Sequence, residues 1–169
     1  MTPRFQPDDT LYKRRNTLKV EYVPDDIVGR DNEIEEYEAA LQPIINGEYP
    51  DNIFIYGKTG VGKTAVTNFL LNELQESAEH FDVDLSVISL NCDGLSTSYQ
   101  AAISLVNNLR EPEHHIAETG HPQSKVYRLL WDELNKLSGT VIIVLDEIDH
   151  ITDDTFFYQI TRADNNGYI

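Results

Sequence analysis

The residues best suited to chemistry lie in one short glycine-rich stretch. It matches the pattern G-x-x-x-x-G-K-[ST] and consists of Gly57, Lys58, Thr59, Gly60, Val61, Gly62, Lys63 and Thr64. In such a loop, backbone N–H groups surround a phosphate, and the start of the following helix adds positive partial charge. The Lys63 ammonium can reach the β- and γ-phosphates of a nucleoside triphosphate, and the Thr64 hydroxyl can become a ligand of Mg²⁺. The stretch therefore predicts a site for a nucleoside triphosphate with Mg²⁺.

A cluster of carboxylates, Asp146-Glu147-Ile148-Asp149, follows the apolar run Val141–Leu145. Ligands of open α/β sheets bind beyond the carboxyl ends of the strands, so we expect this cluster beside the glycine loop. Asp146 is placed to support Mg²⁺, and Glu147 is placed to orient and deprotonate an attacking water. A neighbouring base of this kind would promote wasteful hydrolysis in a phosphotransferase. The pair Asp146-Glu147 therefore favours a hydrolytic ATPase over a kinase.

The elements that must position these groups alternate between strands and helices. Strands are predicted at Ile53–Tyr56, Leu85–Leu90 and Val141–Leu145, the last of them buried on both faces. Helices are predicted from a cap at Asp31 or Asn32 to Gly47, over Lys63–Glu79 and Ser96–Leu109, from Ser124 to a stop at Gly139, and over Thr155–Arg162. This alternation indicates an α/β fold with a parallel sheet, of the P-loop NTPase type.

The composition is strongly acidic, with a net charge of −16 and only six lysines among 169 residues. Such a surface repels itself at ordinary ionic strength, where the Debye length is about 8 Å, and much less near 1 M salt, where it is about 3 Å. This favours adaptation to a salty cytoplasm, with binding to a basic partner as the alternative. Between Asp31 and Leu109 there are 13 acidic residues, and the only basic ones are Lys58 and Lys63 of the glycine loop. Charge placement therefore supports a phosphate site independently of the motif.

Residues 1–20 carry five basic and two acidic side chains, which suggests a basic, flexible arm that is either solvated or in contact with nucleic acid. Residues 21–169 are expected to form one domain. The sequence has no apolar stretch of membrane-spanning length and no apolar signal region, which predicts a cytoplasmic protein without membrane contact. The single cysteine, Cys92, is expected to be a buried apolar residue.

Several segments together resemble archaeal replication initiators, which form the origin-recognition and cell-division-control family of AAA+ ATPases. The resemblance extends over residues 22–169, and the acidic composition is similar to that of haloarchaeal proteins. The segments that carry it are Tyr22-Val23-Pro24, Gly29-Arg30-Asp31, the glycine loop (Walker A), Asn91-Cys92, Asp146-Glu147-Ile148-Asp149-His150 (Walker B) and residues 158–165.

The resemblance implies an ATPase that binds ATP or ADP with Mg²⁺, binds origin DNA, and works with other initiator subunits to load the replicative helicase. It implies that Thr64 and Asp146 hold Mg²⁺ and that Val28 and Arg30 border the adenine. It also implies an initiator-specific insertion within residues 93–120, a candidate DNA-facing element in which Arg110 is the only lysine or arginine.

The family pattern continues with a sensor strand, an arginine finger, a helical lid and a winged-helix DNA-binding domain, and none of these lies within the 169 residues. In the family strand order 5-1-4-3-2, the fourth strand separates Ile53–Tyr56 from Val141–Leu145, so these two should lack a shared neighbour. We therefore expect the N-terminal part of an AAA+ domain, from a truncated or split gene product or a fragment, with weak or absent ATP hydrolysis. The alternatives are a non-catalytic nucleotide- or partner-binding remnant and another AAA+ ATPase, such as a clamp loader or transposition helper.

Overall fold

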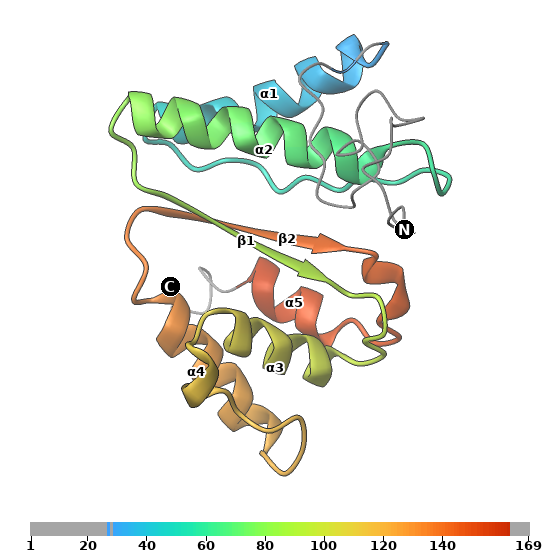
Figure 1. Ribbon diagram of the computed structural model, residues 1–169, viewed down its shortest axis with the longest axis vertical. Helices are drawn as coiled ribbons and strands as arrows, with labels where there is room; N and C mark the ends of the chain where they lie inside the picture. The colour runs from blue at the N-terminus through green and yellow to red at the C-terminus, as the bar shows by residue number, and fades with distance from the viewer. Residues whose placement is uncertain (1–26, 28, 163–169) are drawn as a thin grey trace, which may run out of the picture.

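A small parallel sheet between two groups of helices organises the chain (Figure 1). The computed structural model describes residue 27 and residues 29–162. The sheet pairs β1 (Leu85–Asn91) with β2 (Thr140–Asp146). Helices α1 (Asp31–Ile45) and α2 (Lys63–His80) lie on one side of the sheet. Helices α3 (Ser98–Asn108), α4 (Gln123–Leu134) and α5 (Thr155–Thr161) lie on the other side. The connections contain the 3₁₀ turns η2 (Pro112–His114) and η3 (Ile148–His150). The predicted parallel α/β arrangement is confirmed.

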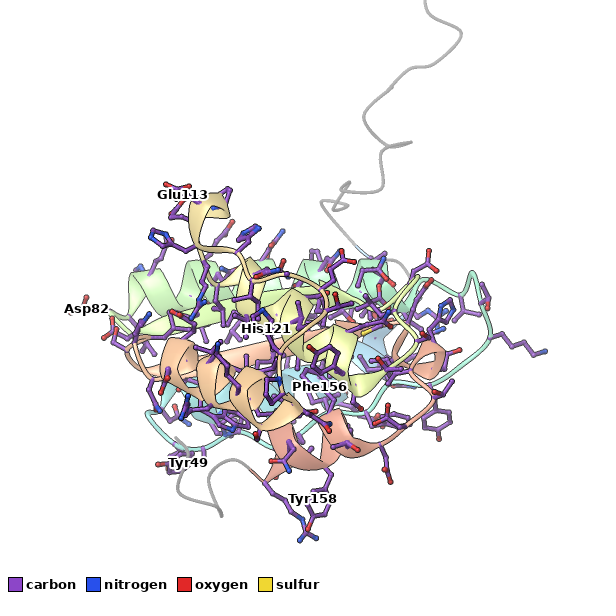
Figure 2. The ribbon with its side chains drawn as sticks, turned by 90° about the horizontal axis from the view of Figure 1, so that it is seen from below. Tyr49, Asp82, Glu113, His121, Phe156 and Tyr158 are labelled. Carbon is purple, nitrogen blue, oxygen red and sulfur yellow. The ribbon has the colours of Figure 1, made fainter. Side chains whose placement is uncertain are left out.

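Two hydrophobic clusters hold the helices on the two faces of the sheet, because successive side chains of a strand point to opposite faces. The cluster under α1 and α2 contains Leu41, Ile44, Leu71 and Leu74 with the strand residues Leu85, Val87, Ile142 and Val144. The larger cluster under α3, α4 and α5 takes Ile88, Leu90, Val141, Ile143 and Leu145 from the strands. Phe156 of α5 is 1% exposed within this cluster (Figure 2), and Cys92 is fully buried there, as predicted.

The strand register brings the carboxyl ends of β1 and β2 to the same edge of the sheet. Asn91 pairs with Asp146, so β1 and β2 end together. At the opposite edge Gly139 has a φ of +70°, and a Cβ atom there would lie 2.1 Å from the Asp84 carbonyl oxygen. The prediction that Gly139 ends the helix from Ser124 is wrong, because α4 already ends at Leu134. Gly139 instead permits the close approach of the chain segments that enter the two strands.

The predicted strand Ile53–Tyr56 is not a strand in the structure. Residues 51–58 have no regular secondary structure, and Phe54 and Tyr56 are 70% and 84% exposed. Among the described residues, no strand pairs with this segment or with the free edge of β2. An extended segment becomes a strand only when a neighbour receives its backbone hydrogen bonds. The same open edge leaves β2 partly exposed along its whole length, contrary to the prediction of full burial.

Residues 93–120, the segment expected to contain an initiator-specific insertion, comprise the core helix α3 and the connections on either side of it. Most of α3 is buried against its neighbours, and the chain projects only after it, with Glu113 at the tip (Figure 2). Arg110 does not offer its charge to solvent, because its Nε atom donates a 2.6 Å hydrogen bond to Glu133 and its side chain is 17% exposed. The described part of this segment therefore lacks an exposed arginine or lysine for a phosphate backbone.

Candidate nucleotide-binding site

The glycine loop leads directly into the N-terminus of α2. Gly60 and Gly62 have φ values of +79° and +90°, a region that residues with a Cβ atom rarely adopt. Gly62 is the N-cap of α2, and its carbonyl accepts the first hydrogen bond of the helix, from the Val66 N–H at 3.0 Å. The first N–H groups of a helix have no partner within the helix. Loop and helix together therefore present backbone donors to an anion.

The Lys63 ammonium lies across the loop. Its Nζ atom donates to the carbonyl oxygens of Gly57 at 3.1 Å and Lys58 at 3.2 Å. Hydrogen bonds between an ammonium and phosphate oxygens are stronger than bonds to neutral carbonyls. A phosphate that enters the loop can therefore replace the two carbonyl oxygens as the partner of the Lys63 ammonium, without a large movement of the Lys63 backbone.

Thr64 and Asp146 meet at the end of β2, although 82 positions separate them in the sequence. The Thr64 Oγ1 atom donates to Asp146 Oδ2 at 2.9 Å, and the other carboxylate oxygen accepts from the Glu147 N–H at 3.0 Å. Both groups offer oxygen, which Mg²⁺ prefers. Adjacent ligands of an octahedral Mg²⁺ with bonds of about 2.0–2.1 Å are about 2.9 Å apart. The types of these two residues and their separation therefore fit a Mg²⁺ site.

Glu147 stands where the chain turns sharply out of β2. Its φ is +53°, and its side chain is 50% exposed. The His150 ring lies between two carboxylates, with Nδ1 3.4 Å from Asp93 Oδ1 and Nε2 4.0 Å from Glu147 Oε2. No sequence motif assigned a role to Asp93 or His150. Asp93 could have been found, because it lies two residues beyond the end of β1, the strand that pairs with β2.

Helix α1 braces the glycine loop and the first turns of α2. Arg30 Nη2 donates to the Val61 carbonyl at 2.6 Å, and the hydroxyls of Tyr37 and Thr67 are 2.7 Å apart. Burial raises the pKa of Tyr37, and the negative charge of Asp146 raises it further. The predicted cap of α1 at Asp31 or Asn32 is wrong, because the N-cap residue is Arg30. These contacts join elements far apart in the sequence, and no local pattern indicates them.

A cleft of about 580 Å³ lies beside the loop. It is lined by Arg30, Glu33, Glu36, Tyr37, Ala40, residues 52–56, Val61, Gly62, Lys63 and Val66. This volume lies within the range of small-molecule sites, about 300–1,000 Å³. Of the residues predicted to border a base, Arg30 lines the cleft, whereas Val28 lies outside the described residues. Residues 1–26, which include the predicted basic arm, and residues 163–169 also lie outside the described residues.

A parallel sheet with a glycine loop and a carboxylate cluster at one edge defines the class of P-loop NTPase folds. Residues 46–167 match the family model described as "AAA domain". The chain belongs to this AAA domain family, and the predicted AAA+ fold is confirmed. None of the described helices is both long and apolar enough to cross a membrane.

Similar proteins confirm the resemblance to archaeal replication initiators. The chain is 94% identical over 169 residues to ORC1-type DNA replication protein 2 of Haloarcula marismortui and covers 41% of that relative. It is 50% identical over 167 residues, 98% of the chain, to ORC1-type DNA replication protein 10 of Halobacterium salinarum and covers 40% of that relative. The chain thus spans about two-fifths of these curated relatives. The similarity to haloarchaeal proteins that the acidic composition suggested is also confirmed.

A solved structure shows the same fold. The Aeropyrum pernix ORC1 protein in complex with DNA matches with a TM-score of 0.79 and 34% identity, over 91% of this chain and 41% of that one. The Aeropyrum pernix ORC2 protein, solved in ADPNP-ADP complexes, matches with a TM-score of 0.68 and 20% identity over the same shares, a likeness of fold alone.

Proposed function

We propose that this chain is the ATP-binding portion of a DNA replication initiator, with residues 1–20 as a basic arm and residues 21–169 as part of an AAA+ domain. The observation that carries the proposal is the 2.9 Å contact between Thr64 and Asp146, which joins the glycine loop to the carboxylate cluster. Origin DNA, other initiator subunits and the helicase are proposed as partners of the whole protein. The names of the relatives and the DNA bound to the Aeropyrum ORC1 protein support this part.

In this proposal the loop N–H groups and Lys63 bind the phosphates of ATP or ADP, and Thr64 and Asp146 would hold Mg²⁺. When bound, Mg²⁺ neutralises charge on the phosphates. Glu147 accepts a proton from water through its carboxylate. Hydrolysis by this chain is weak or absent, because the Glu147 side chain is half exposed and its surroundings do not exclude bulk water.

Titration of ATP with Mg²⁺ against the wild type and Lys63→Ala tests nucleotide binding. Hydrogen bonds to charged groups contribute about 1.5–3 kcal/mol, so Lys63→Ala should raise the Kd about tenfold to a hundredfold. Lys125→Ala is the matched control, because it removes the same charge from an exposed position on α4 and should leave the Kd unchanged. Equal binding by Lys63→Ala and wild type would contradict the proposal and favour a partner-binding remnant.

Single-turnover hydrolysis of bound ATP tests the role of Glu147. A general base contributes about 10²–10⁴-fold to a rate, so Glu147→Gln should abolish the slow hydrolysis of the wild type while ATP binding persists. Multiple turnover at the rate of a complete AAA+ enzyme, sensitive to Glu147→Gln, would show that an exposed base is sufficient and would refute weak hydrolysis.

A further inference from the structure

Arg30, the N-cap residue of α1, makes a side-chain hydrogen bond to the backbone of the glycine loop. Its Nη2 atom donates to the Val61 carbonyl at 2.6 Å, and its Nη1 atom donates to Glu33 Oε1 at 2.7 Å. The two ends of the guanidinium thus have different partners, one on the loop and one on α1. The planar fork of arginine holds both bonds in a fixed mutual orientation, which a lysine cannot do.

The bond to Val61 also fixes the adjacent N–H group. A peptide group is planar and trans, so the Val61 carbonyl and the Gly62 N–H point in opposite directions. Because Arg30 holds the carbonyl on its own side, the Gly62 N–H points away from Arg30. Gly62 is the N-cap of α2 and the second glycine of the phosphate-binding pattern, whose N–H groups contact phosphate oxygens. Arg30 therefore sets the direction of a donor that a phosphate needs.

The surrounding charges point to the same role. Among the described residues up to Leu109, the lysines and arginines are Arg30, Lys58 and Lys63, and all three lie on or contact the glycine loop. Arg30 differs from the two lysines because Glu33 pairs with it directly. This partner offsets much of the Arg30 charge at long range but leaves its hydrogen bond to Val61 intact. Arg30 therefore acts on the loop mainly by orienting the Val61 carbonyl through its hydrogen bond, and less through its positive charge.

We propose that Arg30 is a positioning residue of the phosphate loop, which holds the Val61–Gly62 peptide so that the Gly62 N–H faces the phosphate, and that it does not recognise the base. The inference rests on the proposed function, in which this loop binds the phosphates of a nucleotide. It differs from the expectation drawn from the family resemblance, in which Arg30 borders the adenine.

A ligand series separates the two roles. ATP, GTP and inorganic triphosphate are titrated with Mg²⁺ against the wild type, Arg30→Ala, Arg30→Lys and the control Lys125→Ala. Arg30→Ala should raise the Kd of all three ligands by the same factor, about tenfold for one charge-assisted hydrogen bond. Arg30→Lys, which keeps the charge and loses the fork, should also weaken all three. A loss confined to ATP, or full wild-type affinity in Arg30→Lys, would overturn the inference.

A second measurement needs no nucleotide. In the ligand-free protein, Arg30→Ala should shift the Gly62 amide resonance in the ¹H–¹⁵N spectrum and speed its hydrogen exchange, while the Gly94 amide beyond β1 stays unchanged. An unchanged Gly62 amide would overturn the inference whatever the binding results are. Failure of the proposed function has a different signature, because the wild type would then bind no ligand in a Lys63-dependent way.

Discussion

Replacement of Asp146 by asparagine should weaken ATP binding in the presence of Mg²⁺ and strengthen it in the absence of Mg²⁺. The carboxylate accepts from the Thr64 hydroxyl at 2.9 Å and from the Glu147 N–H at 3.0 Å. An amide can keep both contacts, because its oxygen can accept from the N–H while its NH₂ group donates to the hydroxyl oxygen. The substitution therefore removes a negative charge without removing the local structure. With Mg²⁺ the lost charge weakens binding, and without Mg²⁺ it removes a repulsion against the triphosphate.

The size of the effect follows from the position of Asp146. Its Oδ2 atom is in direct contact with Thr64, at the start of α2, the helix proposed to face the phosphates. Two unit charges about 4 Å apart interact with about 4 kcal/mol at an effective dielectric constant of 20. The contact is exposed to solvent, so we expect about 1–2 kcal/mol, which corresponds to roughly a 5–30-fold change in affinity. The change should have opposite signs in the two conditions.

The assay is calorimetric titration of ATP into the wild type and Asp146→Asn, once with excess Mg²⁺ and once with EDTA. Thr64→Ser is the matched control, because serine keeps the hydroxyl and should preserve the response to Mg²⁺. Weaker binding by Asp146→Asn in both conditions would indicate a structural defect. Unchanged binding in Mg²⁺ would refute the assignment of Asp146 to the metal.

Other predictions concern the scaffold. Hydrogen bonds from Ser98 lower the pKa of Asp153, so its contribution to stability is present above the ordinary pKa of aspartate and is lost as the pH falls through the lowered value. Chemical unfolding should show Asp153→Asn less stable than wild type by about 1 kcal/mol at neutral pH, with the difference vanishing in acid; a constant difference would contradict this. Gly139→Ala should lower the melting temperature more than Gly94→Ala. Both positions have a positive φ, but only at Gly139 would the added Cβ atom meet Asp84. Equal losses of melting temperature would be evidence against the close approach at Gly139. The melting temperature of the wild type should rise between about 0.1 M and 1 M KCl, as the Debye length falls from about 10 to 3 Å, and a flat response would argue against salt adaptation.

The parts of the site that the sequence predicted are those whose signal is local. The glycine loop, the start of α2 at Lys63 and the carboxylates after β2 each depend on residues adjacent in the sequence. The meeting of Thr64 and Asp146 is a long-range contact, yet it was predictable because strands of a parallel sheet end at a common edge. The same rule also places Asp93, just beyond the end of β1, near Glu147.

Other features depend on neighbours that no local pattern reveals. Ile53–Tyr56 has the apolar composition of a strand, but composition cannot supply a partner for its backbone groups, and the segment stays exposed. The family resemblance implied that Arg30 borders the adenine, but its hydrogen bond to a loop carbonyl 31 positions away could not be inferred from the sequence. In both cases the deciding interaction is tertiary.

Under the proposed function, nucleotide binding and ATP hydrolysis would depend on different parts of this chain. The groups proposed to bind phosphate are held by short contacts among Arg30, the glycine loop, α2 and the end of β2. Glu147, the proposed general base, follows β2 in a tight turn, and half of its side chain faces solvent. Water activation gains most where bulk water is excluded and the base is enclosed. Nucleotide binding should therefore survive in conditions where hydrolysis is slow, and the two activities should be measured separately.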